Sequence, residues 1–440
     1  MQSEEAQLAI INGTSGNDYL PGTSGNDTIN GFDGNDRIEG GAGNDTINPG
    51  TSVGGTDSIN PGTGVDTIDF SDREGGLGFA FVDLGWFDPS AGFGGDSGLT
   101  VVIDGENNFG FISGPDISVT FVDVSKGMLN GPFGGLEIQT GRNDGDDEFY
   151  VDPGEGNWLA LSGGMGWDQF HIGENGFLRL EYYTLSQGIV ANLGMGIITR
   201  NYAVDSSLGA SFTLDRITGP GHVSELYGTN FNDRIAGSRH DERFILGQGN
   251  DVLNGKGGID IVRYDRNGVT AVEVDLAKGT AKGAWGGQAF TDRLKNIENV
   301  RGSLNDADKL YGDDADNGLD GRGGNDTLLG RGGSDQLLGG EGNDKLDGGF
   351  GDDVLSGQGG LDKFIFKGNF GHDTITDFDA SKGAEDINLR GVSSIVNFVD
   401  LKNNHMSQVG ADVVIDAGGG NVITLLDVSL AQLDKSDFIF

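Results

Sequence analysis

The sequence predicts an all-β fold, a solenoid of short strands, on three observations. From Gly321 onward the chain repeats one nine-residue unit five times in register, and each unit has an acidic residue at position six and an apolar residue at position eight. The chain contains 82 Gly, enough for a turn in every unit. It contains no Cys, so neither disulfides nor thiolate metal sites can stabilise the fold. Because a short strand cannot bury its side chain alone, the units must stack on one another.

The five units read GRGGNDTLL, GRGGSDQLL, GGEGNDKLD, GGFGDDVLS and GQGGLDKFI, starting at Gly321. Glycines at positions one, two and four allow positive φ and a tight turn, and the x-Leu-x segment that follows forms a brief strand. If two units make one coil, turns two units apart stack about 4.8 Å from each other. Their carboxylates would then repel one another. A cation between the turns removes this repulsion, and carboxylate and carbonyl oxygens are the ligands that Ca²⁺ prefers.

The unit G-G-x-G-x-D-x-U-x, in which U is a large apolar residue, resembles the nonapeptide of the RTX, or haemolysin-type, calcium-binding proteins. This resemblance implies a parallel β-roll, or β-solenoid, with Ca²⁺ held in its turns. It also implies export by a type I secretion system to the outside of a bacterial cell. The ends of the chain fit that expectation. MQSEEAQLAI at the start lacks the features of a secretory signal, and the final Asp437-Phe438-Ile439-Phe440 resembles the uncleaved C-terminal signal of exported family members.

Further units elsewhere in the chain predict its organisation. We expect a leader at 1–12, an N-terminal RTX β-roll at 13–69, an irregular Gly- and Phe-rich β region at 70–140, degenerate units with a strand-rich spacer at 141–227, a second RTX array at 228–263, a strand-rich spacer at 264–301, a C-terminal RTX array at 302–364, and a C-terminal β cap with the export signal at 365–440. A three-residue insertion near Thr51 predicts a bulge in the first array. The two spacers share a longer repeat, in which the phrase from Tyr183 matches the phrase from Tyr264.

The acidic residues at position six are the expected calcium ligands. They are Asp18, Asp27, Asp36, Asp45, Asp57, Asp66, Asp147, Asp168, Asp233, Asp251, Asp260, Asp308, Asp326, Asp335, Asp344, Asp353 and Asp362. Glu242 and Asn317 take this position in two units that depart from the pattern; either could still offer an oxygen. One ion for each pair of stacked turns within the arrays gives about eleven Ca²⁺ ions.

Charge and motifs limit the function. The formal net charge of −40 argues against nucleic acid and anionic membranes as partners, and no apolar stretch is long enough to span a bilayer. The zinc-protease motif H-E-x-x-H is absent, and the single G-x-S-x-G match, from Gly50 to Gly54, falls in the insertion between two turns. The acidic cluster from Asp144 to Glu148 fits calcium binding or solvation better than a glycosidase carboxylate pair.

Two function classes therefore remain open. The sequence favours a secreted calcium-binding protein that folds on Ca²⁺ outside the cell and has no catalytic residues, with a structural or adhesive role at the cell surface or in the extracellular matrix. Its partners would be calcium, the type I exporter and an extracellular polysaccharide or cell-surface ligand. The alternative is an exported polysaccharide lyase, hydrolase or epimerase with its site in 70–140. The four Trp, and Phe residues near Phe93, could then stack on sugars, although filling the inside of a coil is the simpler role.

Overall fold

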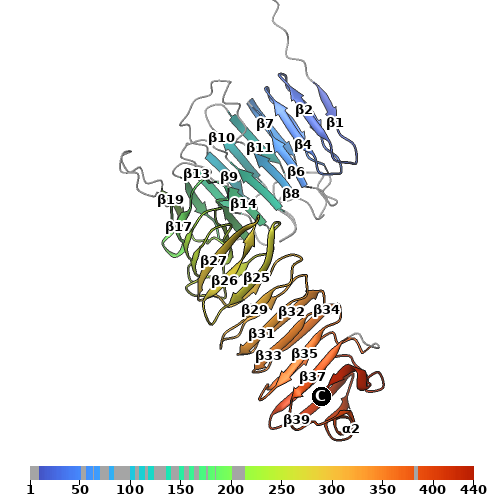
Figure 1. Ribbon diagram of the computed structural model, residues 1–440. Coiled ribbons are helices and arrows are strands. Elements are labelled where there is room, and N and C mark those ends of the chain that lie inside the picture. Colours follow the sequence, from blue (N-terminus) through green and yellow to red (C-terminus); the bar gives the residue numbers. More distant parts are fainter. Residues whose placement is uncertain are drawn as a thin grey trace, which may run out of the picture. The chain divides into compact units, whose positions relative to one another are not determined.

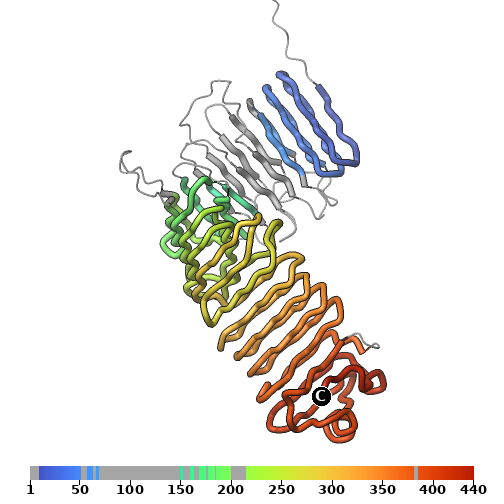
Figure 2. The backbone as a smooth tube through the Cα atoms, viewed as in Figure 1, coloured from blue at the N-terminus to red at the C-terminus, as the bar shows by residue number. Residues whose placement is uncertain are grey.

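The computed structural model describes residues 9–440 except 51–55, 63, 70–78, 84–99, 105–108, 114–116, 123–134, 140–147, 153–157, 163–167, 175–176, 184, 201–213 and 381–384. The predicted bulge near Thr51 therefore lies outside the described residues. The chain forms two units, Met1–Asn230 and Phe231–Phe440. Figure 1 shows the strands of each unit stacked side by side like rungs, and Figure 2 follows the backbone through successive coils. Among the described residues, no helix has the length and apolar character needed to cross a membrane.

The first unit consists almost entirely of strands. They are β1 Ile10–Asn12, β2 Tyr19–Thr23, β3 Thr28–Asn30, β4 Arg37–Gly41, β5 Thr46–Asn48, β6 Thr56–Asn60, β7 Gly64–Asp69, β8 Phe79–Asp83, β9 Thr100–Asp104, β10 Phe109–Ser113, β11 Ile117–Val122, β12 Gly135–Gln139, β13 Glu148–Asp152, β14 Trp158–Ser162, β15 Gln169–Ile172, β16 Phe177–Glu181, β17 Ile189–Asn192, β18 Ile197–Arg200, β19 Leu214–Thr218 and β20 Glu225–Tyr227, with one short 3-10 helix, η3 Leu193–Met195.

The second unit has the same character and ends in a small cap. Its strands are β21 Arg234–Ala236, β22 Arg243–Ile245, β23 Val252–Asn254, β24 Ile261–Arg263, β25 Val269–Asp275, β26 Thr280–Trp285, β27 Gln288–Lys295, β28 Asn299–Arg301, β29 Lys309–Tyr311, β30 Gly318–Asp320, β31 Thr327–Gly332, β32 Gln336–Glu341, β33 Lys345–Phe350, β34 Val354–Gly359, β35 Lys363–Lys367, β36 His372–Ile375, β37 Asp386–Gly391, β38 Met406–Val409, β39 Asp412–Gly418, β40 Asn421–Leu425 and β41 Phe438–Ile439; its helices are α2 Phe398–Asp400, the π-helix η4 Leu401–His405 and the 3-10 helix η5 Lys435–Asp437.

Successive array strands alternate between two sheets, so that two units make one coil. In the last array, β29, β31, β33 and β35 pair in parallel in one sheet, here called the first sheet, and β30, β32, β34 and β36 do so in the other, the second sheet. Strand partners are 18 residues apart, as in the pairs of Leu328 with Leu346 and Leu337 with Leu355. This is the parallel β-roll that the family resemblance of the nine-residue units implies.

The core of the arrays consists of one apolar side chain per unit, and these side chains stack on one another inside the coils. Position eight points inward on each strand because side chains alternate between the two faces of a sheet. Leu328, Leu337, Leu346, Leu355 and Phe364 are all fully buried. Each such side chain contributes roughly 1.5–3 kcal/mol by leaving water. Trp285, the tryptophan whose side chain is described, is also buried and fills the inside of the fold; the side chains of Trp86, Trp158, Trp167 and Phe93 lie outside the described residues.

Antiparallel excursions interrupt the parallel coils. β9, β10 and β11 form one, β17, β18 and β19 a second, and β25, β26 and β27 a third. In the third excursion, β25 pairs in parallel with β29 and β27 with β23, so the chain returns to the coil without breaking the first sheet. The strand-rich segments between the arrays thus contain antiparallel groups of strands. The expected segment boundaries stay a prediction.

The final residues close the end of the roll. β37 pairs in parallel with β35, and β41 pairs in parallel with β37 through Ile387 and Phe438. β38, β39 and β40 form an antiparallel group whose last strand pairs with β36. The terminal apolar residues thus serve as a closing strand. This structural role does not test their proposed part in export.

Candidate calcium sites in the turns

A ladder of hydrogen bonds runs along the acid positions, which are the sixth positions of the units. The backbone N–H of Asp326 donates to Oδ1 of Asp344 at 2.7 Å, and the N–H of Asp344 donates to Oδ1 of Asp362 at 2.8 Å. On the second sheet, Asp335 donates to Asp353 in the same way at 2.8 Å. Each carboxylate is therefore held by the turn one coil earlier, and one of its two oxygens is satisfied.

In a set of buried turns, the other carboxylate oxygen has no hydrogen-bond partner among the residues that the structure describes. These unpartnered Oδ2 atoms belong to Asp36, Asp45, Asp66, Asp251, Asp260, Asp326, Asp335, Asp344, Asp353 and Asp362. The residues are at most 2% exposed. A buried anionic oxygen without a donor or a cation is strongly destabilising. The fold therefore requires a positive partner at each of these atoms.

Burial raises the pKa of these carboxyl groups. The pKa is about 8 for Asp326, about 7 for Asp335 and about 6 for Asp344. The ladder hydrogen bond opposes part of this shift, and the carboxylates of neighbouring turns add to it, such as Asp362 beside Asp344. The charged form is disfavoured at every one of these turns. A divalent cation would reverse the shift by compensating the charge.

A second oxygen lies close to the unpartnered carboxylate in six of these turns, those of Asp36, Asp45, Asp260, Asp326, Asp335 and Asp344. A side chain built on Gly31 would place its Cβ 2.8 Å from Oδ2 of Asp36 and 2.9 Å from the carbonyl oxygen of Pro49, in the next coil of the same sheet. At Gly339, the corresponding Cβ would meet Oδ2 of Asp344 and the carbonyl oxygen of Gly357. Only glycine leaves these oxygens free to converge. An oxygen-only set of carboxylate and main-chain carbonyl donors fits Ca²⁺.

The expected role of the position-one glycine was wrong in one respect. Positive φ occurs at position two and position four, as at Gly340 (φ 108°) and Gly342 (φ 135°). Position one, Gly339 in this unit, does not have positive φ. It is glycine because of the close approach of two oxygens rather than because of backbone conformation. Among the described residues, no three His, Asp or Glu side chains gather around one point, so the candidate sites are built partly from main-chain oxygens.

A family model describes these turns. The model of the RTX calcium-binding nonapeptide repeat matches four segments, at residues 12–47, 227–262, 304–328 and 329–364. The chain carries RTX calcium-binding repeats. The matched RTX segments coincide with the parallel coils of β1–β5, β21–β24 and β29–β35, where most of the unpartnered carboxylate oxygens lie.

Two solved structures are similar to parts of the RTX chain. The extracellular lipase LipA from Serratia marcescens is 22% identical over 50% of this chain, with a TM-score of 0.28; the chain spans 40% of the length of that lipase. The AlgE6R3 subunit of the Azotobacter vinelandii mannuronan C5-epimerase is 29% identical over 31% of this chain and 80% of its own, with a TM-score of 0.21. Each likeness covers half of this RTX chain or less.

The expected ligands fall into groups in the RTX structure. Ten have the unpartnered Oδ2 described above. Asp57, Asp168 and Asp233 are buried members of the ladder. In Asp18, Asp27 and Asp308, by contrast, Oδ2 accepts the backbone N–H of position two in the same turn, each at 2.6 Å. Asp147 lies outside the described residues. Assignment of these residues as ligands stays a prediction.

The two units that depart from the sequence pattern also have satisfied oxygens. Both Oε atoms of Glu242 accept the N–H of Ser238, at 3.0 and 2.8 Å. Oδ1 of Asn317 accepts the N–H of Asp313 at 2.7 Å, and its Nδ2 donates to the carbonyl oxygen of Glu298 at 3.0 Å. In the Asn317 turn, both the side-chain oxygen and the neighbouring carbonyl oxygen are therefore already hydrogen-bonded, and neither is left for a cation.

Sequence reasoning missed several acids that take acid positions in the coils. They are Asp215, Asp292, Glu298, Asp373 and Glu385. Four accept ladder hydrogen bonds from Asp168, Asp251, Asp260 and Asp353, at 3.2, 3.0, 2.8 and 3.0 Å. Glu385 directly precedes β37, where Asp386 pairs with Lys363. The full glycine pattern is absent before these residues, although Asp373 follows glycines at positions one and four, Gly368 and Gly371. The available signal was an acid followed by an apolar residue two places later, as in Asp292-Arg293-Leu294.

A tyrosine hydroxyl takes the second oxygen in two spacers. The Tyr182 hydroxyl donates to Oδ2 of Asp215 at 3.0 Å, and the Tyr264 hydroxyl donates to Oδ2 of Asp292 at 3.1 Å. The sequence comparison had matched Tyr183 with Tyr264; the equivalent residue is Tyr182, one place earlier. Burial raises the pKa of Tyr264 well above its usual value, so the hydroxyl stays protonated and able to donate.

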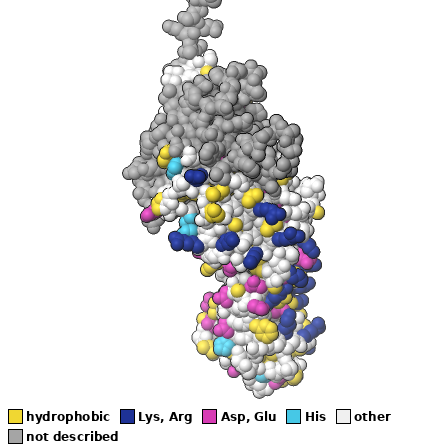
Figure 3. Space-filling model, turned by 90° about the vertical axis from the view of Figure 1, so that its left-hand side faces the viewer, with side chains coloured by type: hydrophobic (Ala, Val, Ile, Leu, Met, Phe, Trp, Pro, Cys, Tyr) yellow, Lys and Arg dark blue, Asp and Glu magenta, His cyan; other side chains and the backbone are white. Residues whose placement is uncertain are grey.

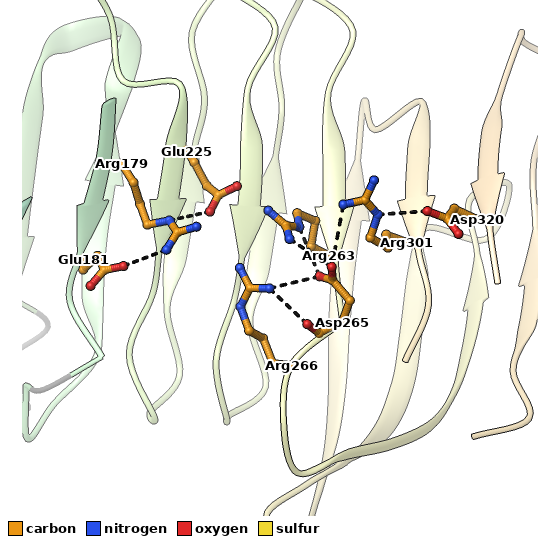
Figure 4. A network of polar contacts seen from close by, with 8 residues as sticks. All are labelled: Arg179, Glu181, Glu225, Arg263, Asp265, Arg266, Arg301 and Asp320. Atoms are coloured by element: carbon orange, nitrogen blue, oxygen red, sulfur yellow. Dashed lines mark hydrogen bonds and ion pairs between the residues drawn. The ribbon is translucent and has the colours of Figure 1, made fainter. Parts of the chain in front are cut away.

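Carboxylates on the second sheet are compensated differently, by arginine. In the first unit, Arg179 contacts Glu225 at 2.5 Å. In the second unit, Asp265 contacts Arg263 at 2.9 Å and Arg301 at 3.6 Å. Figure 4 shows these side chains pointing toward one another from neighbouring strands. Burial alone would raise the pKa of Asp265, but the arginines, Arg263 first, lower it overall. These acids already have cations, unlike those of the turns.

Proposed function

We propose that this RTX chain is a secreted structural or adhesive protein whose arrays fold around Ca²⁺ outside the cell. The observation that carries the proposal is the set of buried, unpartnered carboxylate oxygens, one per turn, spaced by whole coils. Asp36, Asp45 and Asp66 would hold ions in the first array, Asp251 and Asp260 in the second, and Asp326, Asp335, Asp344, Asp353 and Asp362 in the last. When bound, calcium supplies the positive charge that lets carboxylates and carbonyls of successive coils stack.

A row of lysines supports an anionic ligand for the adhesive role. On the outer face of the first sheet, Lys309, Thr327, Lys345 and Lys363 are direct strand partners. The matching row on the second sheet is uncharged: Gly318, Gln336, Val354 and Thr374. The face drawn in Figure 3 carries several groups of Lys and Arg side chains.

The lysine row is incompletely neutralised. Lys309 lies 3.9 Å from Glu273, and Lys363 lies 3.2 Å from Asp386. Lys345 stands directly opposite Lys363 and has no ion pair among the described residues. Like charges opposite each other destabilise a sheet. Much of the acidic charge is meanwhile buried in the turns. The outside of this sheet can therefore attract a polyanion although the chain as a whole is acidic.

Binding to an acidic polysaccharide tests this role. We expect the calcium-loaded protein to bind immobilised polyuronate at low salt, and the pair Lys345→Gln and Lys363→Gln to weaken binding several-fold. Lys402→Gln with Lys435→Gln, two exposed lysines of the cap, is the charge-matched control and should bind as the unaltered chain does. Equal binding by both double variants would contradict the assignment of this face. Preference for duplex DNA over polyuronate would contradict the polysaccharide.

Export through a type I system is part of the same proposal. We expect a chain lacking residues 381–440 to stay inside a cell that has such an exporter, because the proposed signal is gone. A chain lacking the single coil 339–356 but keeping its end should be exported, which separates loss of signal from loss of length. Secretion of the truncated chain at the normal level would place the signal elsewhere. The enzymatic alternative assigned a site to 70–140, where the side chains lie outside the described residues.

A further inference from the structure

We propose that the residue at position two of each turn decides whether that turn takes a Ca²⁺ ion, and that each array starts with turns that take none. The proposal rests on the calcium sites proposed above. Within the arrays, it distinguishes open turns, in which the second acid oxygen lacks a partner, from closed turns, in which the turn's own backbone satisfies it.

Every open turn has positive φ at position two. The residues are Phe32, Gly41, Gly62, Gly247, Lys256, Arg322, Arg331, Gly340, Gly349 and Gln358, with φ between 65° and 108°. They lie four residues before Asp36, Asp45, Asp66, Asp251, Asp260, Asp326, Asp335, Asp344, Asp353 and Asp362, the residues with unpartnered Oδ2. Five of the ten are not glycine. Side chains rarely adopt this conformation, so it is retained there at a cost.

Every closed turn has a short polar residue at position two, without positive φ. The N–H groups of Thr14, Thr23, Ser238, Ser303 and Asp313 donate to the side chains of Asp18, Asp27, Glu242, Asp308 and Asn317. Hydroxyl groups add to the closure. Oγ1 of Thr23 donates to Oδ2 of Asp27 at 2.9 Å, and Oγ of Ser303 donates to Oδ2 of Asp308 at 3.0 Å.

The difference between the two classes is the direction of one peptide group. A turn residue with positive φ follows a peptide that is turned over relative to one with negative φ. In several open turns the position-two N–H donates to a side chain other than the acid at position six. Lys256 donates to Asn254 at 3.2 Å and Gly62 to Asn60 at 3.0 Å, each two residues earlier, and Gln358 donates to Asp377 at 2.9 Å. Because N–H and C=O lie on opposite sides of a planar peptide, turning it removes a donor from the acid and leaves only oxygens near it. Such a turn needs a cation.

Closed turns occur where an array begins. Asp18 and Asp27 are in the first turns of the two sheets in the first array, and Asp308 and Asn317 are in those of the last array. In the second array Glu242 begins one sheet, and Thr229 takes position two ahead of Asp233, which begins the other. Asn317 shows that a closed turn does not require an acid at all. The first and last arrays thus start with a coil that is complete without metal, and the second array has one such turn, at Glu242. Calcium-dependent coils can stack onto these turns.

Exchange of position-two residues tests the proposal. Lys256 is exposed, and Lys256→Thr introduces a β-branched residue with a hydroxyl that disfavours positive φ. We expect this variant to bind one Ca²⁺ ion fewer than the unaltered chain, counted by native mass spectrometry, with its β circular dichroism signal retained. Lys256→Gly loses the same charge but permits positive φ, and should bind the unaltered number.

The reciprocal variant covers the case in which Lys256→Thr fails to fold. Thr23→Gly removes the closing hydroxyl and permits the open conformation, so it should bind one ion more. Unchanged ion counts in both Lys256→Thr and Thr23→Gly would overturn the proposal. If the unaltered chain itself binds no calcium, the proposed function fails first; if it binds calcium but position two has no effect, only this inference fails.

Discussion

Removal of calcium is expected to unfold the arrays of this RTX chain. Without the ions, ten buried carboxylates in the described part of the chain lack a partner for one oxygen, and the chain carries a formal charge of −40. Binding free energy at sites that do not exist in the unfolded chain is folding free energy. We expect circular dichroism to show a largely disordered chain in chelator and a β signal at millimolar Ca²⁺, while Mg²⁺ fails because it gives up its water reluctantly. Identical spectra with and without chelator would contradict this.

The stability of the calcium-free chain is expected to depend on pH through the same buried carboxylates. The pKa values of Asp344, Asp335 and Asp326 are raised to about 6, 7 and 8, whereas an unfolded Asp has its ordinary lower value. Between these values the folded state binds more protons, so its stability rises as pH falls and is lost as pH rises through about 6 to 8. In calcium-free buffer the β signal should therefore be stronger at pH 5 than at pH 8. Added Ca²⁺ should remove this difference.

The substitution Asp344→Asn is expected to weaken calcium-dependent folding much more than a substitution at a surface residue. Asn keeps an oxygen that can accept the N–H of Asp326 but removes the anionic charge, and this turn is hydrogen-bonded to the turns before and after it. Loss of a charged, buried ligand should cost about 1–3 kcal/mol of calcium-dependent stability, compared with within about 0.5 kcal/mol for a surface residue. The midpoint of a calcium titration followed by β signal should rise.

The control for this substitution is Asp400→Asn. Asp400 is half-buried and lies outside the arrays; its side chain accepts hydrogen bonds from Val396 and Asn404 within the cap. This variant should keep the calcium midpoint of the unaltered chain while its local turn loosens. Equal midpoints for Asp344→Asn and Asp400→Asn would show that Asp344 is not a ligand and that the assigned register is wrong.

The repeating parts of this molecule could be predicted from the sequence. The parts in which a hairpin excursion or a tyrosine hydroxyl takes the place of a regular turn could not. Leu328 and its equivalents were placed correctly because a strand with one buried residue per nine has a visible period. Asp292 was missed because a hairpin excursion separates it from Asp251 by 41 residues. The role of Tyr182 could not be seen, since it depends on a hydroxyl that reaches across the coil to Asp215. The repeat of glycine at position one is visible in the sequence. The reason for it, the close approach of oxygens from two coils, is visible only in the structure.

The 18-residue ladder also limits how such a gene can grow or shrink. Duplication of 18 residues adds one complete coil, and every acid still meets the N–H of its counterpart. Duplication of nine residues would send all later strands to the opposite sheet, and the lysine-bearing face would exchange places with the uncharged one. The first array has three extra residues in the sequence between Asp45 and Asp57, and the N–H of Asp36 still donates to Asp57 across 21 positions. Length variation among descendants of this sequence should therefore come in steps of two units, with smaller changes confined to turns.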